Sequence, residues 1–296
     1  MSIVYLNGRF VPKAEALIPA DDRGFIFGDG IYEVVRVIGG RIFAWDEHAV
    51  RLANGLAGLR ISAHGADSAT LRAVCERLVA DNGLAAGEAT VYLQVTRGAA
   101  TRTHHFPPAS TPTTVYASAG AFKVNADLRT KGGKAITYPD QRWARCDLKT
   151  VNLLGPVLAR QAAAEAGAYE AILHRDGMIT EGAATNCFAV IDGVLRTAPL
   201  SNYILPGITR HVLMQLVREL GIRCEERPFT LRELPMVAEL FVCGTTTDVP
   251  PIVTLDERPI GDGQVGPITA RLRDALAARL YAASSLAAAG ARRGVE

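Results

Sequence analysis

Hydrophobic and polar positions change their period along the chain, and these changes predict its helices and strands. Apolar residues recur at helical spacing over Asp46–Leu59, with Val50 among the apolar positions and Asp46 as the N-terminal cap. The same spacing over Ser68–Asp81, closed by Asn82-Gly83, predicts the next helix. Further helices are predicted from about Val151 to Gly167, over Gly207–Leu220 and over Ala270–Ala283.

Short apolar runs separated by turn residues predict strands. Asn7-Gly8 lies between two such runs, and this pair favours a type I′ turn, so a hairpin is expected over Ile3–Val11. Asp176-Gly177 and Asp192-Gly193 mark two further turns. The other strands are predicted at Ile31–Ile38, Arg41–Phe43, Thr90–Thr96, Thr113–Ser118, Ala135–Tyr138, Glu170–His174, Cys187–Ile191, Val194–Thr197 and Phe241–Cys243.

A polar stretch over Gly120–Gly133 holds few large apolar residues and separates two halves of mixed character. We therefore predict a small N-terminal α+β domain over residues 1–120, a linker over 121–128 and a larger C-terminal α+β domain over 129–296. Hairpins interleaved with helices favour an α+β fold over a doubly wound parallel sheet. No GxGxxG motif follows a strand, so a dinucleotide-binding fold has no support.

Composition narrows the class of protein. The 296 residues are 49% hydrophobic and 21% charged with a net charge of +2, and no Lys/Arg run indicates nucleic-acid binding. No run of about 18 apolar residues predicts a membrane span, and the first thirty residues do not resemble a signal peptide. The five cysteines are widely spaced and form no CxxC pair. We expect reduced thiols in a cytoplasmic enzyme.

Lysine is scarce, because the chain has five lysines against twenty-seven arginines. Lys149 differs from the other four by leading directly into an apolar helix. Burial lowers the pKa of a lysine and supplies the neutral amine that carbonyl chemistry needs. Taken alone, a lysine at a helix entrance is more often a capping or surface residue. Glu181 follows a tight turn and by itself is an ordinary surface acid.

Two segments have the composition of anion sites. Pro206-Gly207-Ile208-Thr209 opens a helix, where free backbone N–H groups and a hydroxyl suit a phosphate. The hydroxyl-rich loop Gly244–Thr247 follows a strand, and Arg51 offers a charge from the first helix. The simpler alternatives are a Gly-initiated helix, a Ser/Thr turn and a solvated arginine.

A third candidate is Arg102-Thr103-His104. Alternation along an extended chain places Arg102 and His104 on one side, where a guanidinium and an imidazole suit a carboxylate. The alternative is a polar loop before Pro107-Pro108. A metal site at His104-His105 is disfavoured, because adjacent residues point apart and no further ligand is suitably spaced.

Read in order, several long motifs resemble those of the branched-chain/D-amino-acid aminotransferase family, the fold-type-IV enzymes of pyridoxal 5'-phosphate (PLP). The resemblance runs from Tyr5 to about Leu280. Arg102–Pro107 resembles the D-amino-acid branch, in which an Arg-x-His pair traps the substrate α-carboxylate. The motifs are Asp22–Glu33, Arg142–Lys149, Asn152–Gly155, Glu170–Leu173, Thr180–Gly182 and Asn186.

The resemblance implies roles for individual residues. Lys149 matches the Schiff-base lysine, and Glu181 matches the acid that pairs with the pyridine nitrogen. Tyr32 matches a tyrosine near that lysine and the substrate carboxylate, and Leu205 an apolar residue against the ring. The family is dimeric, so the pair Arg102 and His104 is expected to reach in from the partner subunit. The phosphate is expected to contact Arg51, Ile208, Thr209 and Thr245, with Thr246 close by.

The implied activity is transamination of D-amino acids, such as D-alanine and D-glutamate, with 2-oxo acids such as 2-oxoglutarate or pyruvate. Alternatives on the same fold are an L-branched-chain aminotransferase, an (R)-amine transaminase and an aminodeoxychorismate lyase. A PLP-free binding protein is the alternative from another class. The chain departs from well-known D-amino-acid enzymes at Ala183-Ala184-Thr185 and Gly244, where they carry serines. These lost hydroxyls are expected to alter rate and side-chain preference.

Overall fold

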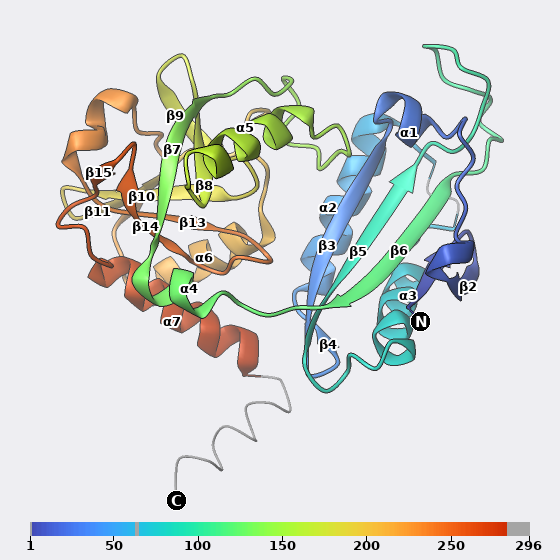
Figure 1. Ribbon diagram of the computed structural model, residues 1–296, viewed down its shortest axis with the longest axis horizontal. Helices are drawn as coiled ribbons and strands as arrows, with labels where there is room; N and C mark the ends of the chain where they lie inside the picture. The colour runs from blue at the N-terminus through green and yellow to red at the C-terminus, as the bar shows by residue number, and fades with distance from the viewer. Residues whose placement is uncertain (1, 63–64, 283–296) are drawn as a thin grey trace, which may run out of the picture. The chain divides into compact units, whose positions relative to one another are not determined.

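The computed structural model describes residues 2–62 and 65–282, which fall into two compact units (Figure 1). Among the described residues, the first unit comprises 2–62 and 65–123, residues Leu148–Asn152 and residues 280–282. The second unit comprises Val124–Asp147 and Leu153–Arg279. The predicted C-terminal domain over 129–296 included Lys149, whereas this division assigns Lys149 to the first unit.

An antiparallel six-stranded sheet forms the first unit, in the order β2-β1-β6-β5-β3-β4. Positive φ angles at Asn7 (48°) and Gly8 (87°) confirm the predicted type I′ turn between β1 and β2. The strands are β1 (Ile3–Leu6), β2 (Arg9–Pro12), β3 (Gly30–Ile38), β4 (Arg41–Ile42), β5 (Glu88–Thr96) and β6 (Thr114–Ala121).

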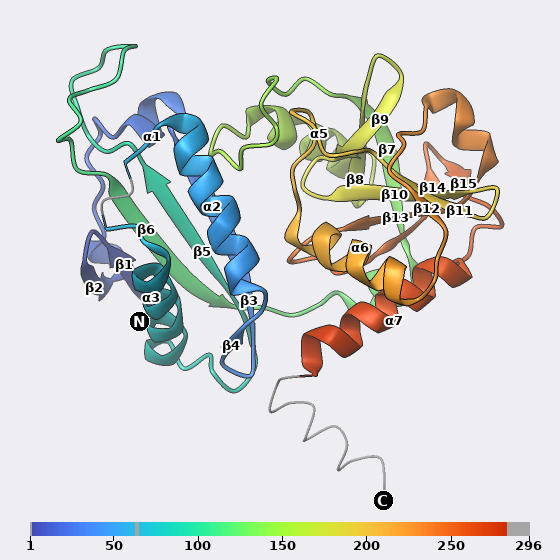
Figure 2. The same ribbon diagram turned by 180° about the vertical axis from the view of Figure 1, so that it is seen from behind.

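Two helices, α2 (Trp45–Leu59) and α3 (Ser68–Asp81), cover one face of this sheet, as Figures 1 and 2 both show. Their apolar side chains, Leu56 and Leu78 among them, pack with inward-facing strand residues such as Val91 into one core. A short helix, α1 (Arg23–Phe27), precedes β3, and a 3-10 turn spans Lys13–Glu15.

The second unit is built on a nine-stranded mixed sheet in the order β12-β11-β10-β13-β14-β7-β8-β9, with β15 paired to β14. The β11/β12, β14/β7 and β7/β8 pairs are parallel and the others antiparallel. The strands are β7 (Gly133–Pro139), β8 (Glu170–Arg175), β9 (Met178–Gly182), β10 (Asn186–Ile191), β11 (Val194–Thr197), β12 (Cys224–Glu225), β13 (Val237–Cys243), β14 (Pro251–Leu255) and β15 (Arg258–Pro259).

Helix α5 (Leu154–Glu165) packs on β8 through Ala159 and Ala163, which are small enough for close contact with Leu173. A second core cluster of this unit includes Phe229 and Leu240. The remaining helices are α4 (Ala126–Lys131), α6 (Ile208–Glu219), α7 (Pro267–Tyr281) and the 3-10 segment Leu231–Met236.

Three details of the predicted elements were wrong. The cap of α2 is Ala44 in a left-handed conformation, which places Asp46 inside the first helical turn. Val50 is 61% exposed, because the buried stripe of α2 runs through other positions. The polar linker contains α4, capped by the Asn125 side chain, which accepts from the Leu128 N–H group. The mixed architecture confirms the α+β prediction, and Ala283 of the last predicted helix lies outside the described residues.

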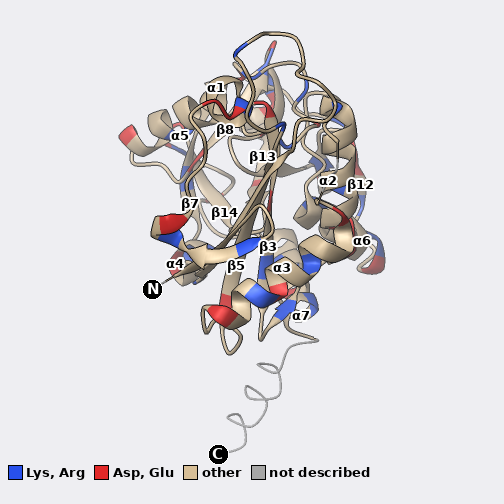
Figure 3. Ribbon diagram, turned by 90° about the vertical axis from the view of Figure 1, so that its right-hand side faces the viewer, with Lys and Arg blue, Asp and Glu red and all other residues tan. Residues whose placement is uncertain are grey.

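Charged residues of both signs are interspersed on the surface. On α3, Arg72 pairs with Glu76 and Arg77 with Asp81, and both signs are visible on this helix in Figure 3. Over residues 2–62 and 65–282, no helix combines the length and the hydrophobicity needed to cross a membrane.

Candidate active site

Lys149 lies beside the first residues of β3. The Tyr32 N–H donates to the Lys149 carbonyl at 3.0 Å, and the Val151 N–H donates to the Gly30 carbonyl at 3.0 Å. This pairing places Nζ of Lys149 3.2 Å from Oη of Tyr32 and 4.3 Å from the centre of its ring. A lysine distant in sequence is thus held against a tyrosine by both backbone and side chain, and the structure brings these two predicted residues together.

Aromatic residues continue from Tyr32 across the sheet face opposite to α2 and α3. The Tyr32 and Tyr92 rings stack at 5.6 Å, and Tyr92 lies 6.5 Å from Tyr116. The Tyr92 hydroxyl donates to Gln94 at 2.6 Å, and burial raises the pKa of Tyr92 to about 12. The face beside Lys149 is therefore lined by aromatic side chains, and a hydrogen bond to Gln94 fixes the direction of the Tyr92 hydroxyl.

Behind Tyr32, the next residue of β3 forms a buried charged cluster with α2. Arg51 donates to Glu33 through Nε at 2.7 Å and Nη2 at 2.6 Å, and Nδ1 of His48 lies 2.8 Å from the same carboxylate. Burial would raise the pKa of Glu33, but Arg51 and His48 together lower it to about 2. Burial lowers the pKa of His48. The predicted phosphate residue Arg51 is thus fixed in direction by a forked ion pair.

Glu181 is a fully buried acid on β9. One carboxylate oxygen lies 2.5 Å from Nη1 of Arg142, and the other accepts from the Asn186 amide at 2.8 Å. The Leu205 N–H reaches both oxygens at 3.2 Å. Burial raises the pKa of Glu181 to about 7, although the charge of Arg142 opposes this. The carboxyl is thus held rigidly and takes up or releases a proton near neutral pH.

Asn186 ties this acid to the start of α6. Its amide also donates to the Leu205 carbonyl at 2.9 Å, and Gly207 packs so closely that an added Cβ would lie 1.9 Å from the Asn186 Oδ1. Gly207 is the cap of α6, so Ile208 and Thr209 occupy its first two positions, whose N–H groups have no intrahelical acceptor. The position of Glu181 is therefore coupled to that of the segment that contains Leu205, Ile208 and Thr209.

The loop after β13 closes on itself. Gly244 and Asp248 pair through backbone hydrogen bonds at 3.2 and 3.0 Å, and Thr245 and Thr246 lie at its tip. Oγ1 of Thr247 is buried and has no hydrogen-bond partner within the described part of the chain. A buried hydroxyl of this kind suits a bound oxyanion or water.

Arg102 and His104 are exposed on the loop between β5 and β6. The Arg102 guanidinium lies 5.3 Å from the centre of the Phe27 ring, and the His104 ring lies 5.7 Å from it. Both side chains contact one aromatic ring, which agrees with the prediction that they share a side of the chain.

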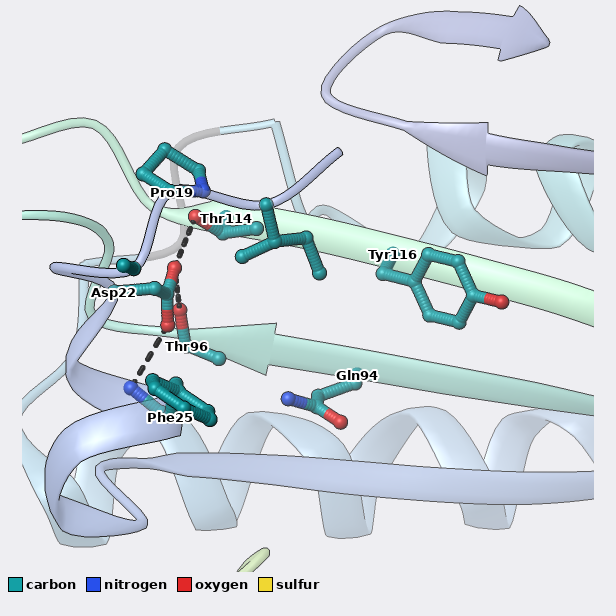
Figure 4. Close-up of a pocket in the computed structure, with 10 residues that line it drawn as sticks. Pro19, Asp22, Phe25, Gln94, Thr96, Thr114 and Tyr116 are labelled. Atoms are coloured by element: carbon teal, nitrogen blue, oxygen red, sulfur yellow. Dashed lines mark hydrogen bonds between the residues drawn. The ribbon is translucent and has the colours of Figure 1, made fainter. Parts of the chain in front are cut away.

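The first unit thus holds Tyr32, Arg51, Arg102, His104 and Lys149, and the second holds the other predicted site residues. Sequence reasoning missed Glu33, His48, Tyr92, Arg142 and Asn186 as parts of these clusters. Strand alternation places Tyr92 and Gln94 on one face, but pairing with Tyr32 depends on a register that local patterns do not give. A pocket bordered by Phe25 and Tyr116 contains none of the predicted site residues (Figure 4).

The clusters have the donors that PLP requires. Lys149 supplies an amine, Glu181 a buried acid for the ring nitrogen, and the first turn of α6 with the partnerless Thr247 hydroxyl supplies donors for a phosphate. The oxygens of Glu181 are already oriented by Asn186 and Leu205. The residues present fit this cofactor.

Comparison with known proteins agrees with this chemistry. Two curated relatives are D-alanine aminotransferases: that of Staphylococcus aureus (strain N315) is 38% identical over 93% of this chain and 96% of its own length. That of Listeria innocua is 41% identical over 92% of this chain and 93% of its own length.

Solved structures give the same fold. The branched-chain amino acid aminotransferase of Escherichia coli superposes with a TM-score of 0.85 at 27% identity, covering 93% of each chain. The branched-chain enzyme of T.th., complexed with N-(5'-phosphopyridoxyl)-L-glutamate, has a TM-score of 0.84 at 28% identity and covers 94% of this chain and 93% of its own.

The family described as "Amino-transferase class IV" matches residues 30–255. This match confirms the predicted fold type, the transaminase class and the dependence on PLP. The chain belongs to the class IV aminotransferase family.

Proposed function

We propose that this chain transfers the amino group of D-amino acids, D-alanine and D-glutamate among them, to 2-oxo acids such as pyruvate or 2-oxoglutarate. The observation that carries the chemistry is the 3.2 Å contact between Nζ of Lys149 and Oη of Tyr32. The preference for D-amino acids is supported by the relatives named D-alanine aminotransferase and by the Arg102/His104 pair.

Lys149 is the proposed Schiff-base residue and proton carrier. When bound, PLP supplies a carbonyl carbon that exchanges amines and a ring that withdraws electrons from the substrate Cα. Nζ of Lys149, once freed from that carbon, would accept the proton from the substrate Cα and deliver it to the cofactor carbon that had carried the carbonyl. The hydrogen bond to Tyr32 limits the directions in which Nζ points, so only a proton on one face of the substrate is reached.

Glu181 is proposed to hold the proton of the ring nitrogen. Its carboxylate is oriented by the Asn186 amide and the Leu205 N–H, so no reorganisation is needed when charge develops on the substrate. Leu205 would pack against the ring of the bound cofactor. Arg142 favours the charged form of Glu181 and so opposes the effect of burial, which raises the pKa of this carboxyl.

The phosphate is proposed to bind Arg51, whose direction Glu33 fixes, together with groups at the start of α6 and in the loop after β13. Backbone N–H groups of a helix start stabilise a doubly charged anion without titrating. The groups from the second unit are those of Ile208, Thr209, Thr245 and Thr246.

Arg102, His104 and Tyr32 are proposed to bind the substrate α-carboxylate. Because Arg102 and His104 are exposed on their own subunit, we propose that they complete the site of the second subunit in a homodimer. The five cysteines are free thiols within the described part of the chain, and the enzyme is proposed to work in the cytoplasm.

A second candidate is transamination of L-branched-chain amino acids, favoured by the structural match to branched-chain enzymes. The visible spectrum of the purified protein, with D-alanine and separately with L-leucine, distinguishes the two. We expect a yellow absorbance band that bleaches with D-alanine alone. Bleaching with L-leucine alone would transfer the chain to the second candidate and remove the role of Arg102 and His104.

The attachment point is tested independently of substrate. Borohydride reduction of the yellow protein, followed by peptide mass spectrometry, should place the phosphopyridoxyl group on Lys149. A label on any other lysine would contradict the assignment.

A further inference from the structure

The loop of residues 97–113, here called the trap loop, is tied at both ends to one buried carboxylate. Thr96 and Thr114, which flank the loop, donate their hydroxyls to Asp22 at 3.0 and 2.6 Å (Figure 4). Asp22 is 1% exposed and also accepts from the Gly24 N–H at 2.8 Å, which makes it the cap of α1. The start of α1 therefore fixes where the trap loop leaves and re-enters the sheet.

The next residue of the chain reaches into the trap loop. Nη1 of Arg23 donates to the Thr103 carbonyl at 2.7 Å and lies 3.5 Å from the His105 carbonyl. Nε of the same guanidinium pairs with Asp29 at 2.9 Å, and the side chain is only 4% exposed. A buried arginine with fixed donors thus holds the carbonyl groups of the two residues that flank His104.

The last residue of α1 supports the side chains of the same loop. The Phe27 ring lies 5.3 Å from the guanidinium carbon of Arg102 and 5.7 Å from the His104 ring, and Arg23 lies 4.7 Å from it. Cations over an aromatic face are attracted to the ring, and the contact limits their rotamers. Helix α1 thus contacts the trap loop through both backbone and side chains around His104.

We propose that Arg23 and Phe27 are positioning residues that hold Arg102 and His104 in the geometry for binding the substrate α-carboxylate. This inference rests on the proposed function of Arg102 and His104. An exposed loop would otherwise lose conformational freedom whenever it bound substrate, and that loss would weaken binding. Support from α1 removes most of this cost before the substrate arrives and fixes the orientation of the forked bond.

The test uses the holoenzymes of three single variants, Arg23→Met, Phe27→Leu and Arg102→Ala. It also uses two double variants, in which Arg102→Ala is combined with either of the other changes. We expect Arg23→Met and Phe27→Leu each to raise KM for D-alanine about tenfold or more while kcat changes less than about threefold. The dissociation constant of propionate, a carboxylate without an amine, should rise by a similar factor in calorimetry. Either change should raise KM by a smaller factor in the Arg102→Ala background than in the wild type, because the support acts only through Arg102 and His104.

Matched controls separate positioning from general damage. Arg36→Met removes an equally buried arginine, paired with Glu88, at the other end of β3 from Tyr32. Phe25→Leu alters an exposed phenylalanine of α1. Both controls should keep the wild-type KM. If Arg23→Met fails to fold, Phe27→Leu carries the test alone, because it removes no buried charge.

Each outcome decides a different point. If Arg102→Ala raises KM but Arg23→Met and Phe27→Leu do not, or if their effects multiply with that of Arg102→Ala, the positioning role is overturned and the proposed function stands. If Arg102→Ala itself leaves KM unchanged, the carboxylate trap is withdrawn, and this inference with it.

Discussion

At the scale of single residues, the orientation of the Lys149 amine is set by its hydrogen bond to Tyr32. Replacing Lys149 with Ala removes both the attachment point and the proton carrier, so we expect turnover to fall by at least about 10³-fold. Steady-state assays with D-alanine and pyruvate measure the loss. The exposed Lys134, paired loosely with Glu257 at 3.7 Å, provides the control Lys134→Ala, which should behave as wild type. Undiminished turnover in Lys149→Ala would rule out the mechanism.

Glu33 makes the stability of the fold sensitive to acid. Its pKa is lowered from 4.5 to about 2, so its contribution to stability is fully present above pH 4.5 and is lost as pH falls towards 2. Glu33→Gln removes this contribution and leaves Arg51 buried without its carboxylate. We expect about 3 kcal/mol less unfolding free energy at pH 7 and a weaker dependence on pH below 4.5.

Urea unfolding at a series of pH values measures both effects. Glu76→Gln is the matched control, since Glu76 forms an exposed pair with Arg72 and should contribute little. A Glu33→Gln variant with the same acid slope as wild type would show that the Arg51 and His48 contacts do not set the pKa of this carboxyl.

The chemical character of site residues was largely predictable from motifs, but their surroundings were not. Nothing near Glu181 in the sequence indicates that it is buried, because its partners Arg142, Asn186 and Leu205 come from three other segments. The same holds for Glu33. Its own strand does not show that it is buried and ionised, because its partners Arg51 and His48 come from α2. Residue types follow from the sequence, whereas burial and ionisation depend on tertiary contacts.

At the scale of elements, Asn186 of β10 packs tightly against Gly207 at the start of α6. Gly207→Ala keeps an ordinary φ of −65°, yet its Cβ would meet the Asn186 Oδ1 at 1.9 Å. Asn186 must then move, and with it the contacts to Glu181 and Leu205. We expect the dissociation constant of PLP to rise about tenfold, as overpacking of this size commonly costs about 1–3 kcal/mol.

Spectroscopic titration of the apoenzyme with PLP measures this change. Gly120→Ala is the control, because no atom lies within 4 Å of its added Cβ and its φ is not positive. Equal affinity in Gly207→Ala and wild type would mean that the contact between Asn186 and Gly207 adjusts without disturbing the cofactor residues.

Elements with strong local signals were predicted well. The bounds of α3 match the expected Ser68–Asp81, because Asp67 caps one end and Asn82-Gly83 closes the other. Short elements were missed: α1 has five residues and β9 follows a turn with no alternation of its own. Such short elements are stabilised by contacts with the rest of the fold. In α1, for example, the buried Asp22 carboxylate accepts a hydrogen bond from the Gly24 N–H.

At the scale of the whole molecule, the sequence indicates two halves but not how distant segments combine. Residues 148–152 follow strands of the second unit and yet pair with the start of β3. No periodicity predicts that pairing, because hydrogen bonds between remote strands depend on the fold around them. The family resemblance supplied the roles that local patterns left open.

The proposed dimer predicts that two inactive variants restore activity when their subunits are mixed. If Arg102 acts on the partner's substrate, Lys149→Ala and Arg102→Ala subunits complement each other. In a hybrid dimer, the site with an intact Lys149 then receives its trap from the Lys149→Ala subunit, whose Arg102 is wild type. Random mixing makes half of the dimers hybrid, each with one complete site, so about a quarter of wild-type activity should return.

The assay is run at a D-alanine concentration well below the KM of Arg102→Ala, where neither parent variant contributes appreciable rate. Subunits are exchanged by mild denaturation and refolding, with wild type treated in parallel to correct for losses. If Arg102 acts within its own subunit, every site in a hybrid lacks one of the two residues and no activity returns. Recovery therefore requires that the trap loop, supported by its own α1, serves the other subunit's Lys149.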